Sequence, residues 1–317
     1  LDPQVQLLWA IPDKDYLTPA LKAAEKADVI IAVMGLTANL EGEEMPVEIE
    51  GFSGGDRTDI KLPQPQEDLL QQLSACGKPV VLVLLSGSAL GVVWAAEHVP
   101  AIVQAWYPGQ AGGAALADVL FGDHNPGGRL PVTFYHSVAD LPPFEDYQMA
   151  GRTYRYFPSE PLFPFGHGLS YTTFQFNNLQ IDQTEIQAGG HVRISAAIIN
   201  SGDRAGDEVV QLYARQFGAG QFGAGQFGAP PRPIKELKGF KRISLQAGER
   251  RTVTFTLFAN QLSTYDEEMI SAVQPGKVEV MIGSSSANLP LKGTFEITGL
   301  KSCVNDTKVF FSQIQVE

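Results

Sequence analysis

The first half of the chain alternates stretches of helical periodicity with short runs in which nearly every residue is apolar. Helical spacing is found at 17–26, 66–75 and 112–120, and the apolar runs lie at 28–35, 79–85 and 101–106. Continuous apolar runs are typical of strands buried on both faces, as in a parallel sheet covered by helices. The pattern therefore predicts an α/β domain with three fully buried strands.

The second half changes to an alternation of apolar and polar positions. This alternation occurs in four stretches, at 191–199, 207–213, 251–257 and 276–282. Short alternating strands separated by Gly-rich turns are typical of an immunoglobulin-like β-sandwich. The second half is therefore predicted to be an all-β domain.

A segment rich in aromatic residues and turns separates the two halves, and we expect it to clamp two domains together. The predicted organisation is an α/β domain at 1–150, an aromatic inter-domain linker at 151–178, a β-sandwich at 179–299, and a tail at 300–317 whose role the sequence leaves open. Inside the sandwich, a short Gln-Phe-Gly-Ala repeat spans 216–229. Such a repeat is too short to bury a face of its own, which favours a flexible loop over an arm that contacts carbohydrate.

Charge and composition exclude several classes of function. The chain has 317 residues and a formal net charge of −12, so no nucleic acid is expected as a partner. Its longest apolar run is far shorter than the roughly 20 residues that cross a bilayer, so no membrane contact is expected either. Cys76 and Cys303 fall in different predicted domains, and the five His residues lack metal-ligand spacing, so we expect no metal and no cofactor. The chain begins at Leu1, and any targeting signal is expected upstream or already removed.

The candidate chemistry lies in the long loop 36–63, which follows the first predicted strand. Loops at the carboxyl ends of parallel strands gather function, and a loop of this length is rarely a plain connection. It carries three carboxylates within four residues, Glu41, Glu43 and Glu44. Repulsion between such charges raises the affinity of one of them for a proton, as a general acid requires. A solvated acidic surface and an Arg-paired loop are the alternatives.

Asp56 and Arg57 follow on the same loop. Arg57 could pair with one of the glutamates, hold a sugar hydroxyl, or complete a surface ion pair, and the surface pair is the default.

Four passages resemble glycoside hydrolase family 3, and the resemblance extends from the start of the chain to about residue 299. They are 107–122, 125–131, 164–171 and 236–240. The family's order is an amino-terminal β/α barrel, an α/β sandwich and often a fibronectin type III-like domain. The chain resembles the second and third of these, so the resemblance implies that the barrel is absent from this chain.

The resemblance implies a retaining mechanism that uses two carboxyl groups. One is an Asp nucleophile on the barrel, and the other is a Glu acid/base on a loop of the α/β sandwich. The family places this Glu six residues after the Gly that ends the first strand, and counting from Gly35 reaches Glu41. Glu43 and Glu44 remain alternatives because the insertion at 45–54 could shift the register. Asp56 and Arg57 are candidates for contact with the substrate or for support of the loop.

The function implied is an exo-acting β-glycosidase. A β-D-xylosidase acting on xylo-oligosaccharides is preferred, because the Glu-x-Glu pattern followed by Asp-Arg is similar to the xylosidase branch, and a β-glucosidase is the alternative. A non-catalytic carbohydrate-binding or assembly fragment is the competing hypothesis from another class. A phosphorylase would be expected to carry a His acid/base, which the loop lacks. The expected partners are a β-linked oligosaccharide, the barrel portion of the same enzyme and, as an option, a second copy of the chain, in a secreted or periplasmic location.

Overall fold

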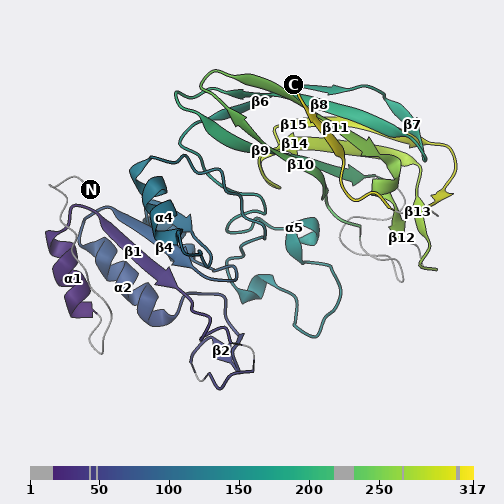
Figure 1. Ribbon diagram of the computed structural model, residues 1–317. Helices are drawn as coiled ribbons and strands as arrows, with labels where there is room; N and C mark the ends of the chain where they lie inside the picture. The colour runs from purple at the N-terminus through teal and green to yellow at the C-terminus, as the bar shows by residue number, and fades with distance from the viewer. Residues whose placement is uncertain (1–16, 43, 48, 218–231, 266–267, 305–307) are drawn as a thin grey trace. The chain divides into compact units, whose positions relative to one another are not determined.

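The computed structural model describes residues 17–317 apart from 43, 48, 218–231, 266–267 and 305–307 (Figure 1). It divides into two compact units. The first comprises Leu1–Ala117 with Phe134–Asp140, and the second comprises Asp118–Thr133 with Leu141–Glu317. The predicted four-part division of the chain stays a prediction.

The first unit is built on a three-stranded parallel sheet of order β1-β4-β5 (Figure 1). Helix α1 packs on α2, and α2 packs on β1. The elements from the start of the described chain are α1 (Leu17–Lys26), β1 (Ile30–Gly35), β2 (Phe52–Ser53), β3 (Asp56–Arg57), α2 (Gln64–Ala75), β4 (Val80–Leu85), α3 (Val93–His98), β5 (Ala101–Gln104), α4 (Gly112–Phe121) and η1 (Val138–Asp140). The predicted α/β architecture with a parallel sheet is thereby confirmed.

Burial within this sheet differs from the prediction of three fully buried strands. Only β4, the middle strand, is almost completely buried. In β1, Ile31 and Val33 remain 48% and 56% exposed, and most of β5 is half-buried. The prediction is wrong for these two strands. Successive side chains point to opposite faces of a strand, and in β1 only Ile30, Ala32 and Met34, on one face, are buried. An unbroken apolar run does not reveal that difference.

The end of β1 is set by a glycine. Gly35 has φ +137, and a Cβ at this position would lie 1.9 Å from the Leu85 carbonyl oxygen of β4. No side chain fits there. The chain therefore leaves the sheet at this residue and enters the acidic loop beside the carboxyl end of β4.

The second unit is a β-sandwich (Figure 1). One sheet has the order β10-β9-β14-β15-β7 and the other has the order β17-β11-β8-β6. The helical elements are α5 (Thr153–Tyr156) and η2 (Ala259–Leu262). The strands are β6 (Phe174–Ile181), β7 (Glu185–Gln187), β8 (His191–Asn200), β9 (Gly206–Gln216), β10 (Glu236–Leu245), β11 (Arg250–Phe258), β12 (Thr264–Tyr265), β13 (Ser271–Val273), β14 (Gly276–Gly283), β15 (Leu291–Thr298), β16 (Ser302–Cys303) and β17 (Gln313–Val316).

Alternate side chains of both sheets form one apolar core. Ile194 of β8, Leu212 of β9 and Phe255 of β11 are completely buried in it. Burial of such side chains stabilises each by about 1.5–3 kcal/mol relative to exposure. The alternation of apolar and polar positions thus correctly predicted an all-β sandwich.

The last residues of the chain take part in this sandwich. Strand β17 pairs antiparallel with β11, with Phe255 opposite Ile314. Strand β16 pairs with β13 in a smaller sheet. The tail, which the sequence assigned to neither domain, thus supplies an outer strand of the second sheet.

Aromatic residues of the segment 151–178 pack within the second unit. Tyr154 stacks on Phe165 with ring centroids 4.4 Å apart, and it meets Tyr213 in a T-shaped arrangement. The expected clamp between two domains stays a prediction. In the Gln-Phe-Gly-Ala repeat, residues 218–229 lie outside the described part of the chain.

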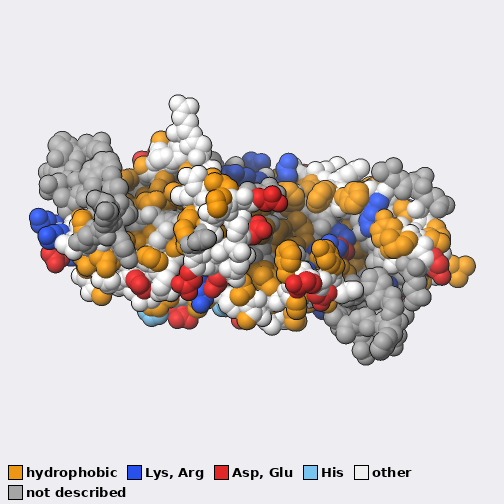
Figure 2. Space-filling view, turned by 90° about the horizontal axis from the view of Figure 1, so that it is seen from below, with side chains coloured by type: hydrophobic (Ala, Val, Ile, Leu, Met, Phe, Trp, Pro, Cys, Tyr) orange, Lys and Arg blue, Asp and Glu red, His pale blue; other side chains and the backbone are white. Residues whose placement is uncertain are grey.

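The surface is mixed in character. In Figure 2, hydrophobic side chains lie beside acidic ones on the visible face. Among the described residues, no helix is long and apolar enough to cross a membrane.

Candidate active site

The start of the acidic loop is fastened to α2. Gly35 N donates to Gln66 Oε1 at 2.7 Å, and Gln66 Nε2 donates back to the Gly35 carbonyl at 2.8 Å. The Thr37 carbonyl then accepts the backbone N–H groups of Leu40 and Glu41, at 2.9 and 3.1 Å. These hydrogen bonds close a single turn that ends at Glu41, and the turn fixes the position of the Glu41 backbone.

The Glu41 carboxylate lies among three hydrogen-bond donors. Ser88 Oγ donates to Oε1 at 2.5 Å, and Tyr107 Oη donates to Oε2 at 2.7 Å. The Gly87 N–H approaches Oε2 at 3.4 Å. Residues 87 and 88 follow β4 and Tyr107 follows β5, so loops from all three parallel strands converge on this carboxylate at their carboxyl ends.

Arg57 joins the acidic loop to the loop after β4 through four hydrogen bonds. Nη1 donates to Ser88 Oγ at 2.9 Å and to the Ala89 carbonyl at 3.2 Å. Nε and Nη2 donate to the carbonyls of Asp59 and Lys61, at 3.0 and 3.1 Å. Arg57 thus touches Ser88, which in turn touches Glu41. Asp56 lies beside it in the short β2–β3 hairpin, with an exposed side chain.

Of the two alternative glutamates, Glu44 has an exposed side chain and a left-handed backbone with φ +51. Glu43 lies outside the described residues.

Glu41 does not have the raised pKa that the acidic loop led us to expect of one of its carboxyl groups. Burial alone would raise its pKa, but the hydrogen bonds from Ser88 and Tyr107, the Gly87 N–H and the Arg57 charge together hold the pKa below its usual value. The expectation that crowding raises the proton affinity of one of the three glutamates stays a prediction.

Ser88 and Tyr107 were missed by the sequence reasoning. Ser88 comes three residues after the predicted strand 79–85, and Tyr107 comes directly after the predicted strand 101–106, at the edge where function gathers in parallel sheets. Applying that rule to all three strands, and not to the first alone, would have placed both beside the acidic loop. A Ser or a Tyr does not by itself indicate a functional site.

The described residues hold no group of three or more His, Cys, Asp or Glu side chains placed to bind a metal ion.

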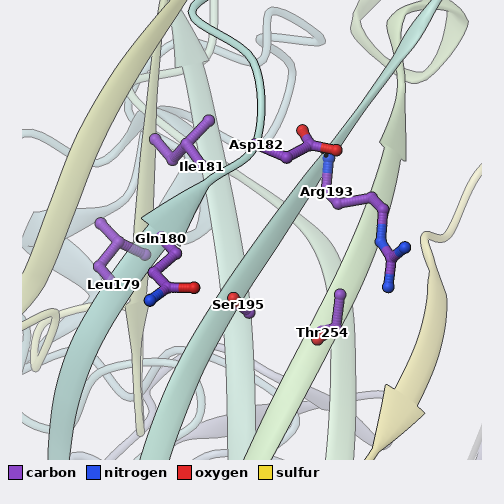
Figure 3. Close-up of a pocket in the computed structure, with 7 residues that line it drawn as sticks. All are labelled: Leu179, Gln180, Ile181, Asp182, Arg193, Ser195 and Thr254. Carbon is purple, nitrogen blue, oxygen red and sulfur yellow. Dashed lines mark hydrogen bonds between the residues drawn. The ribbon is translucent and has the colours of Figure 1, made fainter.

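A hollow of about 620 Å³ lies on the second unit, on the outer face of β6, β8 and β11. Figure 3 shows Asp182 beside Arg193 of β8, with Ser195 on the same strand and Thr254 on β11. Asp182 accepts the Arg193 N–H at 2.8 Å and is the one carboxylate in its lining. The hollow therefore lacks the two carboxyl groups that glycoside hydrolysis uses.

The fold and the site together define an α/β unit with a carboxylate centre at its strand ends, joined in sequence to a fibronectin-like sandwich. Residues 6–171 match the family described as glycosyl hydrolase family 3 C-terminal domain, and residues 208–286 match the fibronectin type III-like domain. The chain belongs to glycosyl hydrolase family 3. The resemblance and the fold class inferred from the sequence are confirmed.

The chain is similar to proteins that are named as glycoside hydrolases. A xylan 1,4-beta-xylosidase of Xylanibacter ruminicola is 47% identical over 264 residues, covering 83% of this chain and 29% of the relative. A periplasmic beta-glucosidase of Salmonella typhimurium is 38% identical over 290 residues, covering 88% of this chain and 35% of the relative. A solved β-glucosidase from Erythrobacter marinus superposes with a TM-score of 0.75 at 37% identity, covering 88% of this chain and 36% of that structure. The chain spans about a third of the length of these proteins.

Proposed function

We propose that this chain supplies the general acid/base of a retaining β-glycosidase, with Glu41 in that role and the Asp nucleophile on a barrel portion outside the chain. The observation that supports this is the convergence of three strand-end loops on the Glu41 carboxylate. The resemblance to the family, counted six residues on from Gly35, also supports Glu41. Glu44 offers less, since its side chain is exposed.

The reaction uses Glu41 twice. In the first step its proton moves to the glycosidic oxygen as the bond from that oxygen to C1 breaks and the nucleophile's bond to C1 forms. In the second step the Glu41 carboxylate takes a proton from water, whose oxygen displaces the nucleophile from C1. The lowered pKa of Glu41 suits the second step. For the first, the nucleophile's negative charge at about 5–5.5 Å would raise the pKa and keep the proton on Glu41.

The proposed substrate is a β-linked xylo-oligosaccharide, cleaved from its end. Support comes from the 47% identical relative named as a xylan 1,4-beta-xylosidase. A β-glucosidase is the second candidate, because the Salmonella relative and the solved structures carry that name. The name of the Salmonella relative also supports a location outside the cytoplasm.

The experiment is chemical rescue of Glu41→Ala in the enzyme that joins this chain to its barrel portion. With 4-nitrophenyl β-xyloside, the leaving group departs without an acid, so the glycosyl-enzyme forms. It then accumulates, because its hydrolysis by water needs the missing general base. Azide needs no base, since its nitrogen bonds C1 while the nucleophile carboxylate leaves. We expect kcat to fall by roughly 10²–10⁴-fold and to recover with azide, yielding the β-glycosyl azide.

Glu43→Ala and Glu44→Ala are the matched variants. Rescue confined to either of them would move the acid/base to that residue. Hydrolysis that persists at the wild-type rate in all three variants would remove the catalytic role from this loop and favour the carbohydrate-binding or assembly fragment.

A further inference from the structure

We propose that Ser88 and Tyr107 are positioning residues that hold the two oxygens of the Glu41 carboxylate in different states, with Arg57 acting through Ser88. Oε1 is held as a permanent acceptor, and Oε2 is the oxygen that gains and loses the proton. This inference rests on the proposed role of Glu41 and concerns how the carboxyl group is oriented.

Ser88 is held from two directions. Its carbonyl accepts Ser86 Oγ at 2.8 Å, and its hydroxyl oxygen accepts Arg57 Nη1 at 2.9 Å. A hydroxyl has one proton to give, and the guanidinium occupies its acceptor side. The Ser88 proton is therefore directed at Glu41 Oε1, at the short distance of 2.5 Å expected for a hydroxyl bound to a carboxylate.

Tyr107 is delivered to the other oxygen by an unusual turn. Trp106 directly precedes it and has φ +57, a left-handed backbone that bulky residues rarely adopt, while the Trp106 ring meets Phe134 edge to face. Strained backbone of this kind persists where the surroundings over-determine it. Here the turn redirects the chain after β5 so that the Tyr107 hydroxyl reaches Oε2.

Gly87 makes room for this approach. A Cβ at Gly87 would lie 2.9 Å from the Tyr107 ring and 3.4 Å from Glu41 Oε2. Any side chain would push the ring away from the carboxylate. The backbone, the ring and the carboxylate thus pack against one another at Oε2.

The two oxygens of the Glu41 carboxylate differ in whether they can carry a proton. Tyr107 is 47% exposed, so its hydroxyl proton can turn toward solvent or substrate and leave its oxygen free to accept from a protonated Oε2. Burial and the neighbouring carboxylate raise the Tyr107 pKa, so the phenol stays neutral. Arg57 holds the Ser88 hydroxyl as a donor to Oε1, so this hydroxyl cannot turn to accept a hydrogen bond from a protonated Oε1. The proton that Glu41 transfers is therefore carried on Oε2.

Within the described part of the chain, the charged or titratable groups that face Glu41 are Arg57 and Tyr107, and Asp59 faces Arg57. Removing a donor to the carboxylate disfavours its charged form and raises its pKa. An acid catalyst works below its pKa, so the alkaline limb of the pH profile must then move to higher pH.

The test measures the pH dependence of kcat/KM for xylobiose, whose leaving sugar requires an acid, in the enzyme joined to its barrel portion. For Tyr107→Phe and Ser88→Ala we expect the alkaline limb to move up and kcat at the optimum to fall by about ten- to a hundredfold, because the carboxyl group loses its orientation. Ser88→Thr keeps the hydroxyl and should restore the wild-type limb. Tyr147→Phe and Ser74→Ala are controls that should leave the profile unchanged.

A second readout separates this inference from the proposed function. Carboxyl ¹³C NMR of the full chain, with Glu41→Gln assigning the signal, should show the Glu41 titration moving to higher pH in Tyr107→Phe. If azide rescues Glu41→Ala while Tyr107→Phe leaves both the limb and the titration in place, the positioning role is overturned and the acid/base role stands. If Glu41→Ala keeps full activity, the acid/base role fails, and the NMR titration alone decides whether Tyr107 holds the carboxylate.

Discussion

At the scale of single residues, the character of Glu41 comes from groups far along the chain. Its donors lie 47 and 66 residues away in Ser88 and Tyr107. Because both are hydroxyls aimed at the carboxylate, they favour its ionised form.

Arg57 is predicted to support the loop through its planar fork of donors. In Arg57→Ala, the carbonyls of Asp59, Lys61 and Ala89 lose a charged donor, and we expect the unfolding free energy to fall by about 2 kcal/mol. Arg57→Lys should recover little of it, because an ammonium group cannot match the fork geometry. Urea denaturation measures both variants.

Arg250→Ala on β11 is the matched control, since Arg250 has an exposed side chain, and it should change the unfolding free energy by less than about 0.5 kcal/mol. A loss in Arg57→Ala no larger than in this control would show that the fork contributes nothing to stability.

At the scale of elements, a charge cluster fastens α5 to the start of β10 in the second unit. Arg155 on α5 forms an ion pair with Glu236, and Lys238 Nζ bonds the same carboxylate at 3.0 Å. Tyr154 Oη also accepts the Leu237 N–H at 3.0 Å. The Lys238 side chain is only 8% exposed, so its charge depends on Glu236.

Glu236→Gln is predicted to destabilise the chain by about 3 kcal/mol at pH 7, because a buried lysine loses its counter-charge. Burial alone would raise the pKa of Glu236, but Lys238 and Arg155 hold it below its usual value. A depressed carboxyl pKa contributes stability above the unfolded pKa that is lost as the pH falls through the folded pKa. The gap in stability between wild type and variant should therefore close in acid, as denaturation at pH 7 and pH 3 would show.

Glu249→Gln is the matched control for this cluster. Glu249 pairs with Arg251 at 2.8 Å on the surface, where ion pairs stabilise little. Equal losses in the two variants at pH 7 would refute a special role for the buried cluster.

The elements themselves were largely readable from the sequence. Residues 17–26 form α1 as predicted, and the alternating stretches form β8, β9, β11 and β14. Periodicity reports which side of an element is apolar. It does not report what covers that side, and so the exposure of β1 and the pairing of β17 with β11 were not predicted.

At the scale of the whole molecule, this chain is about a third of the proteins it resembles. The proposed activity is therefore expected only together with the proposed barrel portion, because retaining chemistry needs a second carboxyl group at about 5–5.5 Å.

Sugar preference is the prediction that belongs to this scale. We expect the joined enzyme to prefer 4-nitrophenyl β-xyloside over the β-glucoside by about 10–200-fold in kcat/KM, since glucose carries one extra hydroxymethyl group that a pentose pocket excludes. Parallel kinetics on the two substrates measure this ratio. A ratio below one would identify a β-glucosidase and leave the role of Glu41 untouched.

The sequence by itself determined the class of each half, because the period of apolar positions follows from the geometry of strands and helices. Its motifs also determined the family, together with the loop on which an acid/base residue is expected. The tertiary structure alone decided the surroundings of Glu41. Hydrogen bonds act over about 3 Å in space, and only the parallel sheet brings residues 41, 57, 88 and 107 within that distance of their partners.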